Sequence, residues 1–169
     1  MKKLVLFFLM LASVPTMAQG ELKFGFLSYD AAFKAMPEYA TMQANMDQLR
    51  SQYEAEQKRV EDDFNKKYEE FLDGQKNFPK TILQKRQSEL QEMLDKNIAF
   101  KKESLRLLSQ SEEEAKAPLK EKLSAVLAKI GEEKGFAFIL NTDGNVAPWI
   151  NMSMGEDINE AVVLLLNEK

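Results

Sequence analysis

The side chains that could take part in catalysis are almost all carboxylates. The chain carries 27 Asp and Glu residues but no Cys and no His, so thiol chemistry and ordinary zinc sites cannot be built. A serine triad lacks its usual histidine base, and the seven glycines do not form the G-x-x-x-x-G-K-S/T loop that binds nucleotide phosphates. Paired carboxylates, as in glycosidases, remain possible, but most of them fall on the polar face of a helical pattern. We therefore expect no enzymatic activity, no cofactor and no metal.

Asp143, Gly144 and Asn145 are the residues most similar to a calcium-binding loop. The glycine directly follows the aspartate, whereas an EF-hand loop needs it five residues after the first ligand, and no acidic residue occupies the closing position. A turn explains these residue types fully. We expect the nearby Trp149 to be a core residue rather than a platform for a ligand.

A local excess of positive charge lies in the middle of the chain. Residues 66–86 hold six basic and three acidic side chains, and the basic ones surround an aromatic residue, Phe78. The candidate contact residues of this segment are Lys76, Phe78, Lys80, Lys85 and Arg86. Two interpretations stay open: a solvated loop, or a mobile basic tip that contacts protein partners or anionic envelope surfaces.

Two long helical segments must position that basic segment. From Pro37 to Asp73 the apolar residues recur in steps of three and four, which is a heptad pattern; they are Tyr39, Met42, Met46, Leu49, Tyr53, Val60, Phe64, Tyr68 and Leu72. Turn signals follow at 73–79. A second segment of similar length runs to Pro118, with apolar positions at Leu83, Leu90, Leu94, Ile98, Leu105 and Leu108. The pattern predicts an antiparallel helical hairpin over 37–117 with its tip near 73–79, and a kink at Pro118.

Charge supports the same hairpin. Residues 54–73 sum to −4 and residues 75–106 to +4, so we expect the two helices to attract each other. Five i,i+4 acid–base pairs in the favourable order should add a little stability within each helix; they are Glu54–Lys58, Asp62–Lys66, Asp63–Lys67, Glu92–Lys96 and Glu112–Lys116.

The remaining residues, 19–36 and 118–169, predict a small base that contains strands. We expect a strand over 22–29, a helix over 30–36, and a strand hairpin formed by 136–140 and 146–151 around a turn at 142–145. A dense apolar stripe from Leu119 to Ile130 should end at Gly135. A last helix, capped by Asp157 with Glu160 or alternatively by Ser153 with Glu156, should bury Ile158, Ala161, Val162 and Leu165. A core of about 70 residues is marginal without disulfides or metal, and open sheet edges seek further strands. We therefore expect an obligate oligomer.

The first eighteen residues have the pattern of a cleavable signal peptide. Lys2 and Lys3 precede the apolar run 4–11, and the small residues Thr16 and Ala18 precede Gln19. The run is shorter than the roughly 20 residues that a membrane span requires. Removal of 1–18 leaves 21 basic and 27 acidic side chains, an acidic balance that argues against nucleic-acid binding. We expect an exported protein.

Four segments, taken in order, resemble the Skp/OmpH family of periplasmic chaperones. They are LKFGFLSYDAAF (22–33), MPEY (36–39) before the charged hairpin, FAFILNTDGNVAPWIN (136–151), and EDINEAVV (156–163), where Asn159 replaces the threonine of the family's Asp-Ile-Thr sequence. The resemblance covers essentially the whole chain after the signal peptide.

The resemblance implies a homotrimer whose base shares strands between subunits and whose three helical tentacles enclose a cavity. Such a protein holds unfolded outer-membrane β-barrel proteins in the periplasm without ATP, and the five tip residues are then candidates for client contact. Met42, Met46, Met93 and Phe100 could line the cavity, although the hairpin's own core is the favoured assignment for each. Family members tend to have basic tentacles, whereas this chain is acidic, so no lipopolysaccharide-binding residues are assigned. The alternative function is a structural coiled-coil spacer or adaptor of the cell envelope.

Overall fold

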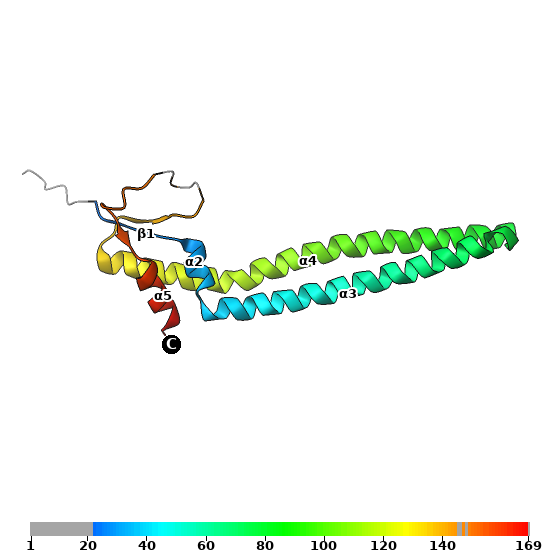
Figure 1. Ribbon diagram of the computed structural model, residues 1–169, viewed down its shortest axis with the longest axis horizontal. Helices are drawn as coiled ribbons and strands as arrows, with labels where there is room; N and C mark the ends of the chain where they lie inside the picture. Colours follow the sequence, from blue (N-terminus) through cyan, green and yellow to red (C-terminus); the bar gives the residue numbers. More distant parts are fainter. Residues whose placement is uncertain (1–21, 145–146, 148, 169) are drawn as a thin grey trace, which may run out of the picture.

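The computed structural model describes residues 22–144, 147 and 149–168. Its elements in chain order are β1 (Phe24–Leu27), α2 (Tyr29–Lys34), α3 (Pro37–Gly74), the 3-10 turn η1 (Gln75–Asn77), α4 (Lys80–Lys134), β2 (Phe138–Asn141), β3 (Glu156–Asp157) and α5 (Asn159–Asn167). α3 and α4 lie side by side as a long hairpin, and the other elements gather at its open end (Figure 1). The predicted fold class, mainly helical with a long hairpin on a small strand-containing base, is confirmed. The signal-peptide prediction lies outside the described residues.

The two long helices begin and end where the sequence provides the matching residues. α3 starts at Pro37, whose fixed φ and missing N–H suit the first helical position. α4 ends at Gly135, which takes a left-handed φ of 64° and donates its N–H to the carbonyl of Glu132. α4 continues through Pro118 without interruption. This one helix of 55 residues therefore belongs to both the hairpin and the base. No helix among the described residues has an apolar run long enough to cross a membrane.

The sheet has the order β2-β1-β3, with both outer strands parallel to β1. This arrangement corrects the predicted hairpin, because β2 and β3 lie on opposite edges and do not pair with each other. In the segment 146–151, the described residues Ala147 and Trp149–Asn151 form no strand. The third strand is Glu156–Asp157 instead, and Ile158 extends it by donating its N–H to the carbonyl of Phe26. The apolar residues of 146–151 suggest a strand, but within one chain β1 already has a neighbour on each side.

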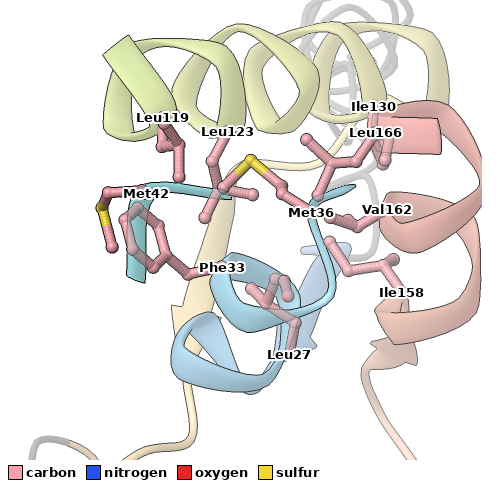
Figure 2. Packing of buried hydrophobic residues seen from close by; sticks show 11 residues of the cluster. Leu27, Phe33, Met36, Met42, Leu119, Leu123, Ile130, Ile158, Val162 and Leu166 are labelled. Carbon is pink, nitrogen blue, oxygen red and sulfur yellow. The ribbon is translucent and has the colours of Figure 1, made fainter. Parts of the chain in front are cut away.

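The core lies where β1, α2, the base end of α4 and α5 meet (Figure 2). Its fully buried side chains include Leu27, Met36, Leu123, Ile130, Ile158, Val162 and Leu166. Burial of each such side chain contributes about 1.5–3 kcal/mol. In α5 the prediction is confirmed for Ile158 and Val162, whereas Leu166 rather than Leu165 is the third buried residue.

Asp143 ties the end of β2 to the start of α2. Its carboxylate accepts a hydrogen bond from the Ser28 hydroxyl (2.6 Å) and one from the backbone N–H of Asp30 (2.7 Å). These two bonds lower the pKa of Asp143 below its ordinary value, the Ser28 bond most of all. The residue that looked like part of a calcium loop thus caps a helix, and the following Gly144 has a φ of 64°, as a turn requires.

Asp157 stabilises the start of α5 in a way that differs from the predicted capping box. Its Oδ1 accepts the backbone N–H of Asn159, two residues on, at 2.9 Å. The capping box would place that bond three residues on. α5 itself begins at Asn159 with Ile158 as its cap residue.

Candidate functional site

The described residues contain no cluster that suggests metal-dependent chemistry. No group of three or more acidic side chains there is placed to hold a metal ion. Apart from those of Asp143 and Lys116, the shifted pKa values belong mostly to exposed partners of surface hydrogen bonds and ion pairs; for example, the bond from Lys122 lowers the pKa of Glu38. The one buried polar side chain in the described part is Ser104, whose hydroxyl donates to the Phe100 carbonyl at 2.8 Å. The candidate sites considered next are surfaces of the hairpin and of the base.

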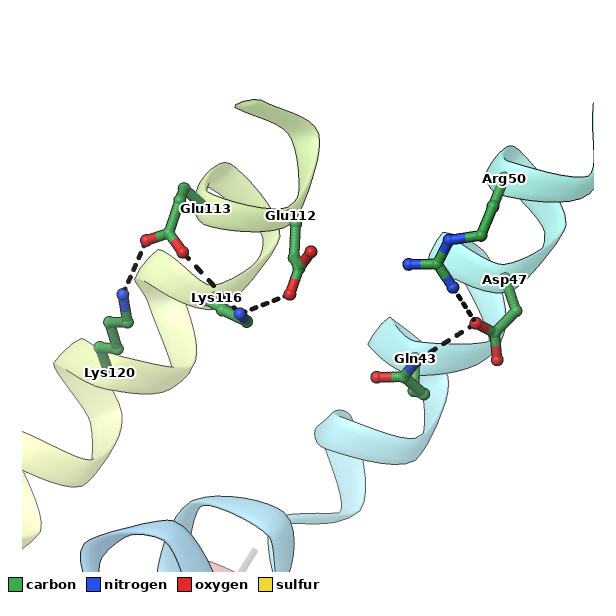
Figure 3. A network of polar contacts seen from close by, with 7 residues as sticks. All are labelled: Gln43, Asp47, Arg50, Glu112, Glu113, Lys116 and Lys120. Atoms are coloured by element: carbon green, nitrogen blue, oxygen red, sulfur yellow. Dashed lines mark hydrogen bonds and ion pairs between the residues drawn. The ribbon is translucent and has the colours of Figure 1, made fainter. Parts of the chain in front are cut away.

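The ion pairs of the hairpin run along each helix and seldom across it. Figure 3 shows one cluster on each arm, Asp47 with Arg50 on α3 and Lys116 with Glu112 on α4. Among the described residues, Lys122–Glu38 at 2.7 Å is the only ion pair that joins α3 to α4. The predicted pairs Glu92–Lys96 and Glu112–Lys116 are confirmed.

Three of the predicted i,i+4 pairs are replaced by other partners. Lys58 pairs with Asp62 and Arg59 with Asp63, so Glu54–Lys58, Asp62–Lys66 and Asp63–Lys67 do not form. Apart from Lys122–Glu38 beside the base, no ion pair in the described residues joins the two oppositely charged arms.

The seam of α4 differs from the predicted one. One stripe of buried or half-buried side chains follows steps of three and four and faces α3; it consists of Leu90, Met93, Asn97, Phe100, Ser104 and Leu107. Of the predicted seam positions, Leu83, Leu90 and Leu108 are half-buried. Tyr53 of α3 lies 6.3 Å from the Phe100 ring, and the Asn97 amide donates to the Val60 carbonyl at 3.1 Å. Two polar residues therefore occupy positions that a hydrophobicity pattern assigns to apolar ones.

Three large apolar residues that were predicted to lie in that seam are exposed instead. Leu94, Ile98 and Leu105, which we call the exposed stripe, are 40%, 59% and 62% exposed. Leu94 and Ile98 line a shallow groove between the two helices together with Phe64 of α3. By contrast, Met42 and Met46 are buried, and Met93 and Phe100 are half-buried. The four residues that could have lined a cavity between subunits are therefore at least partly covered within the chain itself. The sequence of α4 contains more apolar residues than one seam against α3 can bury, and this excess is the signal that could have predicted the exposed stripe.

The tip of the hairpin is the segment from Gly74 to Pro79 with the adjoining helix ends. Lys76, Lys80, Lys85 and Arg86 are exposed there, as the sequence suggests. Phe78 is half-buried, because its ring folds back over Gly74 and lies 6.5 Å from the ring of Phe71. The position of Gly74 under the ring leaves no room for a side chain.

A small pocket of about 160 Å³ lies just behind the tip, between the two helices. Its lining combines four apolar side chains with two acidic and two basic ones; they are Phe71, Phe78, Leu90, Met93, Glu70, Glu89, Lys67 and Arg86. Phe78 and Arg86 are therefore the only two of the five predicted tip residues that this pocket uses. Glu89 is bonded to Arg86 at 3.2 Å and lies 3.7 Å from Lys85. Met93, which the sequence suggested as a possible cavity residue, lines this pocket at the tip.

The base also exposes large apolar side chains. Trp149 is 79% exposed, which corrects its expected place in the core, and Met152 and Met154 follow at 61% and 69%. Phe138 on edge strand β2 is 42% exposed and stacks on Phe24 at 5.4 Å. An exposed aromatic residue on an edge strand, such as Phe138, is typical of a surface that another polypeptide covers.

One family model matches most of the chain, and a solved structure shares its fold. The sequence profile of the family described as "Outer membrane protein (OmpH-like)" matches residues 23–166. A solved structure described as an outer membrane chaperone (OmpH-like) from Caulobacter crescentus CB15 is similar in fold, with a TM-score of 0.68 and 16% identity over 86% of this chain and 83% of that one. No curated protein matches the chain.

Proposed function

The chain belongs to the OmpH-like family of outer membrane proteins, and on this basis we propose that it is a chaperone that holds unfolded outer-membrane β-barrel proteins in the periplasm. The proposal needs no cofactor and no chemical step. A protein that binds the unfolded state of a client in preference to the folded state suppresses its collapse and aggregation by mass action alone.

The observation that carries the proposal is the unusual exposure of large apolar side chains on the hairpin. Six of them are at least 40% exposed along α3 and α4; they are Tyr68, Leu72, Ile82, Leu94, Ile98 and Leu105. Three of the six, Leu94, Ile98 and Leu105, recur at steps of four and seven and so form one apolar stripe on α4. A continuous apolar stripe of this kind is typical of a surface that binds a partner. Apolar contacts separated by charged residues suit a client that is extended and variable in sequence.

Many weak contacts can hold such a client firmly. Once one segment is bound, the next contact is intramolecular and has a high effective concentration, so overall affinity exceeds that of any single site. This effect grows if several hairpins surround the client. We propose that the base assembles the chain into a trimer through its edge strands and the exposed Phe138, Trp149, Met152 and Met154; the number three rests on the resemblance to the family.

The test compares client protection by the protein and by a variant of the exposed stripe. Leu94→Ser, Ile98→Ser and Leu105→Ser would be combined, and urea-denatured outer-membrane barrels would be diluted into each protein while light scattering is followed. We expect the wild-type protein to suppress scattering and the triple variant to lose much of that effect. The matched control replaces three exposed polar residues of the same helix with serine: Gln87, Gln91 and Lys102.

Two outcomes would contradict the proposal. Unchanged aggregation with the wild-type protein at a threefold excess of subunits would favour the envelope spacer, and equal protection by the triple variant would remove the exposed stripe from client binding. The basic tip is tested separately by Lys76→Glu, Lys80→Glu, Lys85→Glu and Arg86→Glu, since unchanged client affinity in that variant would show that tip charge has no part.

A further inference from the structure

The pocket behind the tip is more specific than the rest of the hairpin surface. Elsewhere the exposed apolar residues form open, shallow contacts, whereas here Phe71, Phe78, Leu90 and Met93 enclose about 160 Å³ between two helices. An engineered apolar cavity of roughly 150 Å³ binds benzene. The tip pocket therefore has the size of one aromatic ring.

The lining favours a ring over an aliphatic side chain. The rings of Phe71 and Phe78 are tilted 42° to each other, which leaves faces and edges that a third ring can meet. The Met93 thioether makes favourable contacts with aromatic edges. Lys67 and Arg86 at the rim bring cations that attract the face of an aromatic ring.

The charges around the pocket favour an acidic neighbourhood for that ring. The two basic and two acidic side chains of the lining balance each other, and the positive charge comes from the tip around them, where residues 66–86 carry six basic and three acidic side chains. Of the two carboxylates in the lining, Glu89 already faces Arg86 and Lys85 within 3.7 Å. A segment with negative charge next to its aromatic residue thus meets more attraction than repulsion.

We propose that this pocket binds a single aromatic side chain from an acidic stretch of an unfolded polypeptide and so anchors the client at the hairpin tip. The inference rests on the proposed chaperone function and names one feature that a client segment must have. The exposed stripe then supplies contacts that tolerate many client sequences, while the tip pocket selects client segments that carry an aromatic residue among acidic ones.

A substitution at Gly74 would change the shape of the pocket. A β-carbon at this position would lie 2.8 Å from Phe78 Cε1, so alanine would push the ring that forms one wall of the pocket. The backbone of Gly74 has φ −90° and ψ −18°, which alanine adopts without strain. Gly131→Ala is the matched control, because its new methyl group would meet only Ile139 Cδ1 at an ordinary 3.7 Å.

The experiment uses the purified protein labelled with ¹³C at its methionine methyl groups. Met93 lines the pocket, while Met42 and Met46 are buried near the base and serve as internal references. The probe is the peptide acetyl-Asp-Asp-Phe-Asp-Asp-amide, compared with versions that carry Leu in place of Phe or Lys in place of Asp. The Met93 signal is assigned with Met93→Leu.

We expect the Phe peptide to shift the Met93 signal through the ring current and to leave Met42 and Met46 unchanged. The Leu peptide should bind roughly threefold or more weakly, the Lys peptide should bind more weakly than the Asp peptide, and Gly74→Ala should lose the response that Gly131→Ala keeps. Equal binding of the Phe and Leu peptides, or an unchanged response in Gly74→Ala, would overturn the proposal.

Two further results would assign the pocket to another occupant and also overturn it. One is a Met93 shift that follows protein concentration without peptide, and the other is a shift caused by phosphatidylglycerol vesicles but not by the peptide. The scattering assay with denatured barrels separates this inference from the proposed function. Protection of barrels without a peptide response would support the chaperone function and contradict the aromatic pocket. A peptide response without protection would support the pocket and contradict the chaperone function.

Discussion

Leu123 in the base has no exposed surface, whereas Leu105, earlier on the same helix, is 62% exposed. In the base, β1, α2 and α5 surround α4, so its apolar face is enclosed. In the hairpin only α3 covers α4, and two helices cannot enclose both apolar stripes that the sequence of α4 carries. α4 therefore differs along its length: its base end is enclosed in the core, and its hairpin end leaves apolar surface exposed.

The most severe test of this comparison is Leu123→Ala. Leu123 is fully buried in the base core, so removal of its side chain should lower the free energy of unfolding by about 2–5 kcal/mol. Urea unfolding followed by circular dichroism, at matched chain concentration, measures the loss. A change below about 1 kcal/mol would mean that the site collapses around the smaller side chain and that the base core is not the centre of stability.

Asn97→Leu tests the packing of α4 against α3 in the hairpin. Asn97 occupies a seam position, where a polar residue specifies register at a cost in stability. We expect leucine there to raise the free energy of unfolding by about 1 kcal/mol, because the buried apolar area gained exceeds the bond to Val60 that is lost. The same urea titration checks this, with exposed Asn45→Leu on α3 as the control. A lower stability would show that the bond to Val60 holds the two helices in register.

Asp143→Asn tests the link between β2 and α2 through pH. The pKa of Asp143 is lowered in the folded protein, so its contribution to stability is present above the unfolded pKa of about 3.9 and is lost as pH falls toward the folded value. We expect the variant to melt at a lower temperature than the wild type at pH 7 and the difference to shrink at pH 3. Thermal unfolding at both pH values measures this.

The control for that comparison is Asp95→Asn on the exposed face of α4. Other carboxylates with lowered pKa values, such as Glu38 and Glu103, are common to both proteins and cancel in the difference. A difference in melting temperature that stays constant from pH 7 to pH 3 would contradict the capping role.

Leu105→Ala should have the smallest effect on stability. Its side chain is largely exposed, so the free energy of unfolding should change by no more than about 0.5 kcal/mol. Protection of denatured barrels should nevertheless weaken, since one contact of the exposed stripe is removed. A loss of stability comparable with that of Leu123→Ala would show that Leu105 is covered in solution and would erase the contrast between the two ends of α4.

The sequence determined the elements whose signals are local. Pro37 marked the start of α3, Gly135 the end of α4, and the spacing of apolar residues predicted the two long helices between them. The same spacing failed to separate core from surface on α4, because Leu94, Ile98 and Leu105 rank above Asn97 and Ser104 in hydrophobicity. Which stripe faces α3 depends on the register of the hairpin, and register is a property of both helices together.

Only the tertiary structure decided the contacts between distant segments. Pairing of β1 with β2 and β3 joins residues that are far apart in the chain, so no local pattern announces parallel strands or excludes a hairpin. Asp143 caps a helix whose first turn lies 113 residues earlier, and Met93 meets Phe71 and Phe78 only because the chain reverses at Gly74. Helix limits follow from each residue's own backbone preferences, whereas pockets, caps and sheet order follow from which surfaces the folded chain brings together.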